Sequence, residues 1–451
     1  MEIIGFIGVL AAICLIILFS AKGLNILIGA PLATMVVLVT NRMNVLEWML
    51  RPEQSYLASV GDFFVSMFAL FILGTILSQY MQDSHATTSI ARTVLKIVGR
   101  DKPFNALFAL AVIGLLISYG GINSVIVYFA IIPIAHSVFK ELDINWRLIC
   151  IPVFLGVASI TMTMLPGTPS PTNVIPAEAL GTSMTAGKLL GFGASIVAFI
   201  YGVVYMKFRL DKSLANDETF YSYLEDTDQE MEDPDESDLD EEEVAEEDIP
   251  PFFLSILPML VLIAIIFMFS EVTNIVVIAL LAAVLLCAIF FRKYLNSSDK
   301  ELLNEGAADA VMPTLAMGST VAFGTVLIES TGFNFIVTFL NSVLANPVLR
   351  LTIVSVALGA ITGSSSGTVG ILVNTMAPEI IAEGVDPVVV HRISGVASSI
   401  FALLPHAGAY ITFSSLTHLP QKSTYRDSFA IVGGCHFVAL ITMLVITYFF
   451  Y

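Results

Sequence analysis

Residues 165–173 read Leu-Pro-Gly-Thr-Pro-Ser-Pro-Thr-Asn and lie in the middle of an otherwise apolar segment, 148–183. Pro166, Pro169 and Pro171 cannot continue a helix, because each lacks a backbone N–H and disfavours the helical conformation in the residue before it. Non-helical backbone at membrane depth survives only where it is buried in protein or lines a watery cavity. The stretch therefore predicts a helix that is broken inside a bilayer.

Three further apolar segments are interrupted in a similar way, at Ser118–Ser124, Thr362–Thr368 and Pro405–Tyr410. The N-termini of half-helices present free N–H groups and a partial positive charge, which suit a carboxylate. Unwound carbonyls and Ser, Thr or Asn oxygens suit a cation. One such break alone is more typical of a kink or a small-residue packing contact. Four breaks in two matching pairs favour a binding site.

The composition indicates a membrane protein. Of the 451 residues, 56% are hydrophobic and only 13% are charged. A soluble domain needs a polar outer face, whereas a bilayer accepts apolar helices that satisfy their own backbone. The segments predicted to cross or enter the bilayer are 3–20, 24–41, 61–81, 103–138, 148–183, 186–206, 251–270, 273–291, 309–329, 348–382, 393–419 and 428–450.

One long stretch differs from the rest in charge. Between Asp217 and Asp248 the chain holds 18 of its 38 carboxylates and no Lys or Arg, which leaves 20 carboxylates against 20 Lys and Arg elsewhere. A run of like charges with few large apolar residues repels itself. We expect 213–250 to be a disordered acidic linker on the cytoplasmic side.

The segments before and after this linker have the same order, which suggests an internal duplication. Gly156–Ser159 recurs as Gly395–Ser398, and Leu165-Pro166 recurs as Leu404-Pro405 at the same shift of 239 positions. Two earlier matches, which pair Gly114 and Pro133 with Gly359 and Pro378, and Gly74-Thr75 with Gly324-Thr325, occur at similar shifts. The chain thus reads as two related halves.

Basic residues orient these halves, because Lys and Arg concentrate in cytoplasmic loops. The basic residues outside the predicted spans include Arg92, Lys96, Arg100, Lys102, Lys207, Arg209, Lys212, Arg292, Lys293, Lys422 and Arg426. All fall on one side if each half crosses the membrane five times and 103–138 and 348–382 are re-entrant hairpins. An odd number of crossings makes the two halves antiparallel, as in the inverted-topology repeats of secondary transporters.

The predicted fold is an all-α polytopic membrane protein with two inverted-topology repeats. Residues 1–212 form the first repeat, with scaffold spans in 1–81, a hairpin at 103–138, a broken helix at 148–183 and a span at 186–206. Residues 251–451 form the second repeat, with scaffold spans in 251–329, a hairpin at 348–382, a broken helix at 393–419 and a span at 428–450.

The polar side chains of the breaks are the predicted substrate and ion ligands: Ser118, Asn123, Thr168, Thr172, Asn173, Ser364, Ser365, Thr368 and His406. No Lys or Arg lies in any break, so backbone dipoles and hydroxyls would have to hold an anion. The four cysteines lie singly in apolar runs and fit neither a disulfide framework nor a metal site. No nucleophile elbow or paired intramembrane carboxylates indicate an enzyme. We expect no metal, no cofactor and no nucleic-acid partner.

At these residues the sequence resembles the gluconate permease (gluconate:proton symporter) family, within the wider ion-transporter superfamily. Residues 165–172 are similar to that family's Leu-Pro-Pro-His-Pro-Gly-Pro-Thr stretch, and Ala357-Leu358-Gly359 and His406 also fit. The resemblance covers nearly the whole chain except the acidic linker. It implies import of a sugar acid or other small hydroxy-carboxylate with a cation, by a homodimer whose transport domain moves as an elevator in a bacterial inner or plasma membrane.

Three positions depart from the family pattern. Thr168 replaces a histidine, Gly120 replaces a glutamate, and Gly408-Ala409 replaces Asn-Asp. The coupling ion is therefore left open between H⁺ and Na⁺. Alternative functions are a sodium-coupled carboxylate transporter or an ion antiporter of the same superfamily, and, less favoured, a channel.

Overall fold

A computed structural model describes residues 2–22, 24–98, 102–119, 124–168, 170–226, 248–269, 275–343 and 345–451. Within these ranges the chain is helical and contains no β-strand. In the first half the helices are α1 (Glu2–Ala21), α2 (Ile26–Thr40), α3 (Val45–Leu50), α4 (Tyr56–Asp83), α5 (Ala86–Val98), α6 (Pro103–Tyr119), α7 (Ser124–Glu141), η1 (Trp146–Ile149), α8 (Cys150–Phe154), η2 (Leu155–Ile160), α9 (Pro171–Leu180), α10 (Lys188–Ala215) and η3 (Phe220–Asp226). In the second half they are α12 (Phe252–Met268), α13 (Ile275–Phe290), α14 (Asp299–Ile328), α15 (Thr331–Val343), α16 (Pro347–Thr362), α17 (Ser365–Thr375), α18 (Ala377–Ala382), α19 (Pro387–Ala397), α20 (Gly408–Thr417) and α21 (Gln421–Phe450).

Several helices suit a bilayer. Among the described residues, α1, α10, α14 and α21 are long and apolar enough to cross a membrane, and α4, bent by 50°, would be a fifth such span. The predicted spans 24–41 and 273–291 form shorter helices, α2 and α13, of 15 and 16 residues. At about 1.5 Å per residue these cover less than a hydrocarbon core of about 30 Å.

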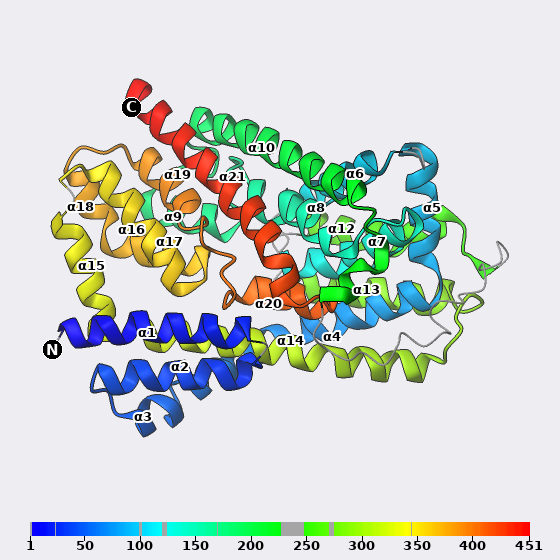
Figure 1. The fold of residues 1–451 in the computed structure, drawn as a ribbon, viewed down its shortest axis with the longest axis horizontal. Coiled ribbons are helices and arrows are strands. Elements are labelled where there is room, and N and C mark those ends of the chain that lie inside the picture. The colour runs from blue at the N-terminus through cyan, green and yellow to red at the C-terminus, as the bar shows by residue number, and fades with distance from the viewer. Residues whose placement is uncertain are drawn as a thin grey trace.

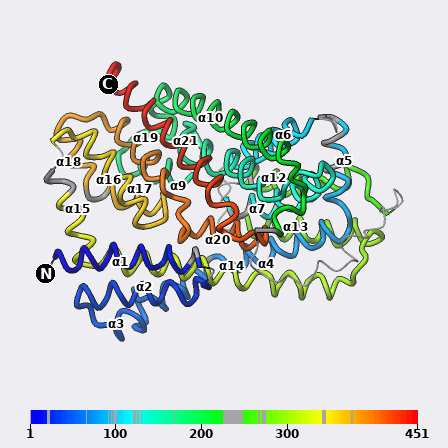
Figure 2. Tube along the Cα trace, in the orientation of Figure 1, coloured from blue at the N-terminus to red at the C-terminus, as the bar shows by residue number. Residues whose placement is uncertain are grey.

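Two long helix pairs organise the molecule. In Figure 1, α4 and α14 pack along each other at the lower edge, and α10 and α21 do so at the upper edge. The smaller contacts come in corresponding sets: α1 packs on α15 and α12 on α5, while α2 packs on α14 and α13 on α4. Helices of each half thus pack against helices of the other half. Figure 2 shows both chain termini at the same end of the molecule.

The two broken helices are interrupted close to the predicted positions, but each break begins earlier, and the predicted break residues Thr172, Asn173 and 408–410 already belong to α9 and α20. Between η2 and α9, and between α19 and α20, the described backbone leaves the helical conformation over 161–170 and 398–407. The second hairpin turns at Gly363, whose φ of 61° is one that glycine adopts without a steric penalty. The tip of the first hairpin, 120–123, lies outside the described residues.

The start of the range expected to be a disordered linker is folded. The α10 helix continues to Ala215, and η3 follows it. Glu218 accepts hydrogen bonds from Ser213 at 2.6 Å, Arg147 at 2.7 Å and Asn145 at 3.1 Å. Burial acts to raise the pKa of Glu218, but these bonds outweigh it and lower the pKa. Phe220 is buried against Trp146, so an anchored carboxylate and a buried ring hold this segment.

An ion pair joins the two last helices of the halves. Arg209 of α10 donates to both carboxylate oxygens of Asp427 of α21, at 2.6 and 2.7 Å, and the Tyr205 hydroxyl donates to the same carboxylate at 2.7 Å. The Asp427 side chain is only 3% exposed. A pair this well buried leaves a costly isolated charge when one partner is removed.

We predict that Asp427→Ala lowers stability by about 3–5 kcal/mol, because it leaves the Arg209 guanidinium without its carboxylate. The measurement is the thermal midpoint of the purified protein in detergent. The matched control is Asp211→Ala, which removes the exposed partner of Lys207 on the same helix and should cost about 1 kcal/mol or less. Equal midpoints for the two variants would contradict the prediction.

Candidate functional site

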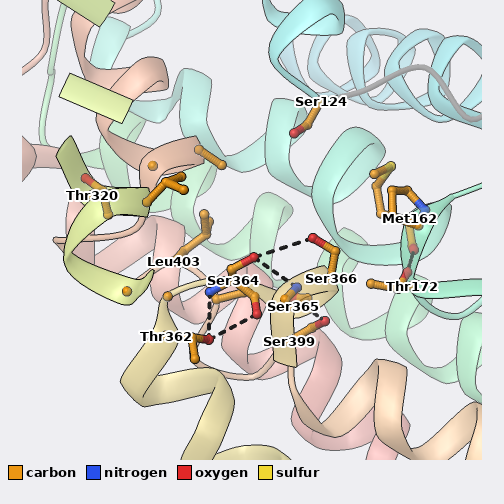
Figure 3. A pocket seen from close by; sticks show the side chains of 18 of the residues that line it. Ser124, Met162, Thr172, Thr320, Thr362, Ser364, Ser365, Ser366, Ser399 and Leu403 are labelled. Atoms are coloured by element: carbon orange, nitrogen blue, oxygen red, sulfur yellow. Dashed lines mark hydrogen bonds between the residues drawn. The ribbon is translucent and has the colours of Figure 1, made fainter. Parts of the chain in front are cut away.

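A cavity of about 390 Å³ lies where the breaks meet the scaffold helix α14. Its walls come from both halves of the chain: the start of α7, the first break and α9, the hairpin tip at 362–367, the second break and the start of α20. In Figure 3, Ser364, Ser365, Ser366 and Ser399 lie together on one side, with Thr172 and Met162 on another and Thr320 on α14. Residues far apart in sequence thus form one chamber.

The α14 helix supplies one continuous wall. The lining residues recur at spacings of three and four, which places them on one face of the helix. They are Met317, Thr320, Val321, Gly324, Thr325 and Ile328. This face combines two hydroxyls with apolar side chains.

Four helix N-termini reach the cavity. Ser124 begins α7, Pro171 and Thr172 begin α9, Ser365 begins α17 and Gly408 begins α20, and all of these residues line the cavity. The first N–H groups of a helix have no acceptor within it and carry partial positive charge. Neither α9 nor α20 has a side-chain cap hydrogen bond, so these donors are not used by the helix's own capping residue.

The second hairpin tip is held by its own hydroxyls. The Ser364 side chain caps α17 by accepting from the Gly367 N–H at 3.3 Å, and the Thr362 hydroxyl donates to the Ser364 carbonyl at 3.1 Å. Ser365 accepts a hydrogen bond from Ser399 of the second break at 2.8 Å. The tip is therefore shaped before any ligand arrives.

The cavity is uncharged. Among the described residues that line it, none is Lys, Arg, His, Asp or Glu, and hydroxyls alternate with apolar side chains. A wall of this kind can bind an anion only through N–H and O–H donors and helix dipoles. It avoids the cost of burying a charged side chain when the site is empty.

The nine predicted site residues separate into three groups. Thr172, Ser364 and Ser365 line the cavity. Those buried behind it are Ser118, Thr168, Asn173, Thr368 and His406. Asn123 lies outside the described residues.

The residues behind the cavity secure the breaks. The Ser118 hydroxyl lies 2.6 Å from the Thr161 hydroxyl, and Thr368 lies 2.8 Å from Thr362. Thr168 donates to the Leu165 carbonyl at 3.2 Å. These side chains hold the backbone around the breaks in place and do not point into the chamber.

Asn173 contacts three separate parts of the chain. Its amide nitrogen donates to the carbonyls of Thr168 at 2.7 Å and Met184 at 3.1 Å, and its oxygen lies 2.7 Å from a ring nitrogen of His391. One side chain thus joins the first break, the loop before α10 and the α19 helix.

His406 is the least satisfied of the predicted residues. It is fully buried, and neither ring nitrogen makes a hydrogen bond to the described part of the protein. Its Nε2 lies against the hairpin-tip residue Gly363, where an added Cβ would be 3.0 Å away. The ring therefore lies directly beneath the cavity wall.

Sequence reasoning missed several lining residues and one buried pair. Ser124, Thr320, Thr362, Ser366 and Ser399 also line the cavity. Thr320 could have been found from the three-and-four spacing of small and hydroxyl residues along 317–328. The buried residues His391 and Arg392 directly precede the predicted start of their span at 393 and are not among the predicted site residues.

Long apolar helices that enclose an uncharged chamber at the meeting point of broken helices define a membrane transport protein. The profile of the GntP family permease matches residues 3–449, so the chain belongs to this family. It is 28% identical over 459 residues to the uncharacterized transporter YxjC of Bacillus subtilis (strain 168), covering 94% of each chain. It also resembles the crystal structure of the YdaH transporter of Alcanivorax borkumensis, described as having an unusual topology, with 15% identity, a TM-score of 0.42 and 87% of each chain covered. The protein is a secondary transporter and not an enzyme.

We predict that Asn173→Ala lowers stability by about 1–3 kcal/mol, because it leaves the Thr168 carbonyl and the ring nitrogen Nε2 of His391 without their partner. The measurement is again the thermal midpoint in detergent. Asn334→Ala, at an exposed position on α15, is the control and should leave the midpoint unchanged. An unchanged midpoint for Asn173→Ala would show that the break is held by other contacts.

Proposed function

We propose that this permease imports a small organic anion, a gluconate-like sugar acid or another small hydroxy-carboxylate, together with a cation across a bacterial cell membrane. The observation that carries the proposal is the convergence of four helix N-termini on an uncharged, hydroxyl-lined cavity. Helix N-termini favour carboxylates through free N–H groups and the helix dipole. The many hydroxyls suit a substrate that itself carries hydroxyl groups.

The size of the cavity agrees with a small substrate. Its volume of about 390 Å³ is near the lower end of the roughly 300–1,000 Å³ typical of small-molecule sites. The apolar lining, which includes Met162, Met317 and Leu403, would exclude water around the carbon skeleton. These features favour a compact acid over a lipid or a peptide.

Two coupling ions have support from different residues. A buried imidazole with no hydrogen-bond partner, His406, favours a proton. The hydroxyls and carbonyls around Thr362, Ser364 and Thr368 offer the oxygen ligands that favour sodium. A sodium-coupled carboxylate transporter or an ion antiporter is therefore the second candidate.

The proposed mechanism is alternating access by two inverted repeats. The corresponding contact sets of the two halves support the repeat relationship. The spans within 1–81 and 251–329 form the scaffold, and the hairpins, broken helices, α10 and α21 form the moving part. We further propose that the permease works as a homodimer with the acidic linker in the cytoplasm.

The test is uptake of labelled gluconate and a panel of small carboxylates into proteoliposomes under an imposed proton or sodium gradient. Saturable accumulation that requires a gradient supports symport, and the effective gradient identifies the ion. Accumulation driven by protons would make His406 the next residue to replace. Failure of every carboxylate under both gradients would overturn the substrate class.

We predict that Ser365→Ala and Thr172→Ala each reduce substrate uptake roughly tenfold, the loss expected for one hydrogen bond to a charged group. Ser355→Ala is the control, because its hydroxyl donates to Leu351 within its own helix at 2.6 Å and does not line the cavity. The Ser365→Ala and Ser355→Ala variants should purify with wild-type thermal midpoints, whereas Thr172→Ala also removes a hydrogen bond to the Met162 carbonyl and should lower the midpoint somewhat. Wild-type uptake in both cavity variants would show that the substrate binds elsewhere.

A further inference from the structure

A second cavity of about 190 Å³ lies beside the central one. It is bounded by Ser78 and Gln82 of α4, by His136 of α7, and by Trp146 and Tyr223. Unlike the central cavity it receives no residue from α14, and the central cavity receives none from α4. The two chambers therefore face different scaffold helices.

Tyr128 of α7 separates the two chambers. Of the residues that line them in the described part of the chain, Tyr128 alone contributes to both. The ring is fully buried and packs edge-on against Phe154 at 6.1 Å and Phe413 at 5.8 Å, measured between ring centroids. The Tyr128 ring therefore lies at the boundary between the two cavities.

The Tyr128 hydroxyl makes no hydrogen bond of normal geometry in the described part of the protein, and the partner it approaches is the Ser124 side chain, which itself lines the central cavity. A buried polar group that is poorly paired costs up to about 1–3 kcal/mol, and such groups are rare unless they have a role. A phenol O–H is a good donor to a carboxylate. The weakly paired hydroxyl at the boundary between two chambers thus points to a ligand that passes it.

The far end of the second cavity is covered by the start of the acidic linker. Tyr223 lies on η3, which is held in place by Phe220 and by the Glu218 ion pair. The α10 helix begins near the C-terminus of the chain and runs away from it, so its C-terminal end, from which this segment leaves, is directed toward the end of the molecule that holds α5 (Figure 2). The second cavity therefore leads toward the linker side.

We propose that Tyr128 is the gate between the substrate cavity and a second chamber that forms the route to the linker side. This inference rests on the proposed transport of a small carboxylate. The ring blocks the route in the present conformation. When it swings aside, the hydroxyl donates to the carboxylate as the substrate passes from the helix N-termini into the second chamber. If Tyr128 had a purely structural role, its ring would only fill space and its hydroxyl would make no contact with the substrate as it passes.

The accessibility test needs no substrate. In a background with the exposed Cys14 replaced by Ser, single cysteines are placed at Ser78 in the second cavity and at Ser365 in the central one. A membrane-impermeant methanethiosulfonate sulfonate is added to vesicles of both orientations. The orientation in which the Ser78→Cys protein reacts defines the linker side.

We expect the Ser365→Cys protein to be protected from that side while Tyr128 is present. Adding Tyr128→Ala, or Tyr128→Leu if the alanine variant does not purify intact, should increase its labelling from that side at least tenfold. The matched control is Phe139→Ala, which removes another buried ring of α7 that lines neither cavity and should leave the protection unchanged. Equal labelling with and without the Tyr128 ring would overturn the gate.

Transport kinetics then test the hydroxyl. Tyr128→Phe keeps the ring, so the Ser365→Cys protein should stay protected and the thermal midpoint should not fall. The maximal rate of gluconate uptake should fall roughly tenfold with little change in KM, because the hydrogen bond is made only during passage. An unchanged maximal rate would remove the hydroxyl from the proposal. If wild-type protein transports no carboxylate, the proposed function fails, whereas the labelling result still decides whether Tyr128 separates the chambers.

Discussion

The constraint on which this structure depends is that every peptide group at membrane depth needs a hydrogen-bond partner, because lipid provides none. A helix broken inside the membrane creates such groups at both of its new ends. In the first break the Thr172 hydroxyl donates to the Met162 carbonyl, and the Gly167 N–H donates to the Met184 carbonyl at 2.9 Å. Asn173 donates to the same Met184 carbonyl and to one further carbonyl, that of Thr168. Side chains and a neighbouring loop replace the helical bonds that the prolines remove, and the helix ends left over face the cavity.

The same need for hydrogen-bond partners explains the contacts of Arg392, a buried residue that the sequence analysis did not single out. Arg392 is 2% exposed and donates to the carbonyls of Ala186 and Met184, both at 2.7 Å, and no carboxylate pairs with it among the described residues. A buried charge without a counterion is costly. The two hydrogen bonds of Arg392 to these carbonyls hold the loop before α10 against the α19 helix.

The sequence predicts the breaks well because prolines, glycines and hydroxyl residues in an apolar run have few structural solutions. It predicts the site less well. Thr172, Ser364 and Ser365 face the cavity, whereas Thr168, Asn173 and Thr368 lie in the same stretches but face the protein. Thr168 lies in unwound backbone, where no fixed period relates position to direction, whereas Asn173 and Thr368 lie in the first turns of α9 and α17, and the motif does not reveal where these helices begin. The wall formed by α14 differs, because the helical period tells which of its residues share one face. Which face lines the cavity can be decided only once the element opposite it is known.

The helices α4 and α14 correspond to each other on the proposed repeat relationship, but they pack against different partners, and this difference bears on the proposed transport motion. On the same relationship, α9 corresponds to α20. The second helix of the first hairpin, α7, corresponds to α17, which follows the turn of the second hairpin. In the described structure α14 packs on α20, but the corresponding pair α4 and α9 does not pack to a comparable extent. Likewise α4 packs on α7, but the corresponding pair α14 and α17 does not pack to a comparable extent. The central cavity lies against α14 and the second cavity against α4. If the two halves are inverted repeats, as proposed, the two sets of contacts are mirror images that differ little in free energy. On the proposed alternating-access mechanism, exchanging the two sets would place the substrate cavity against α4.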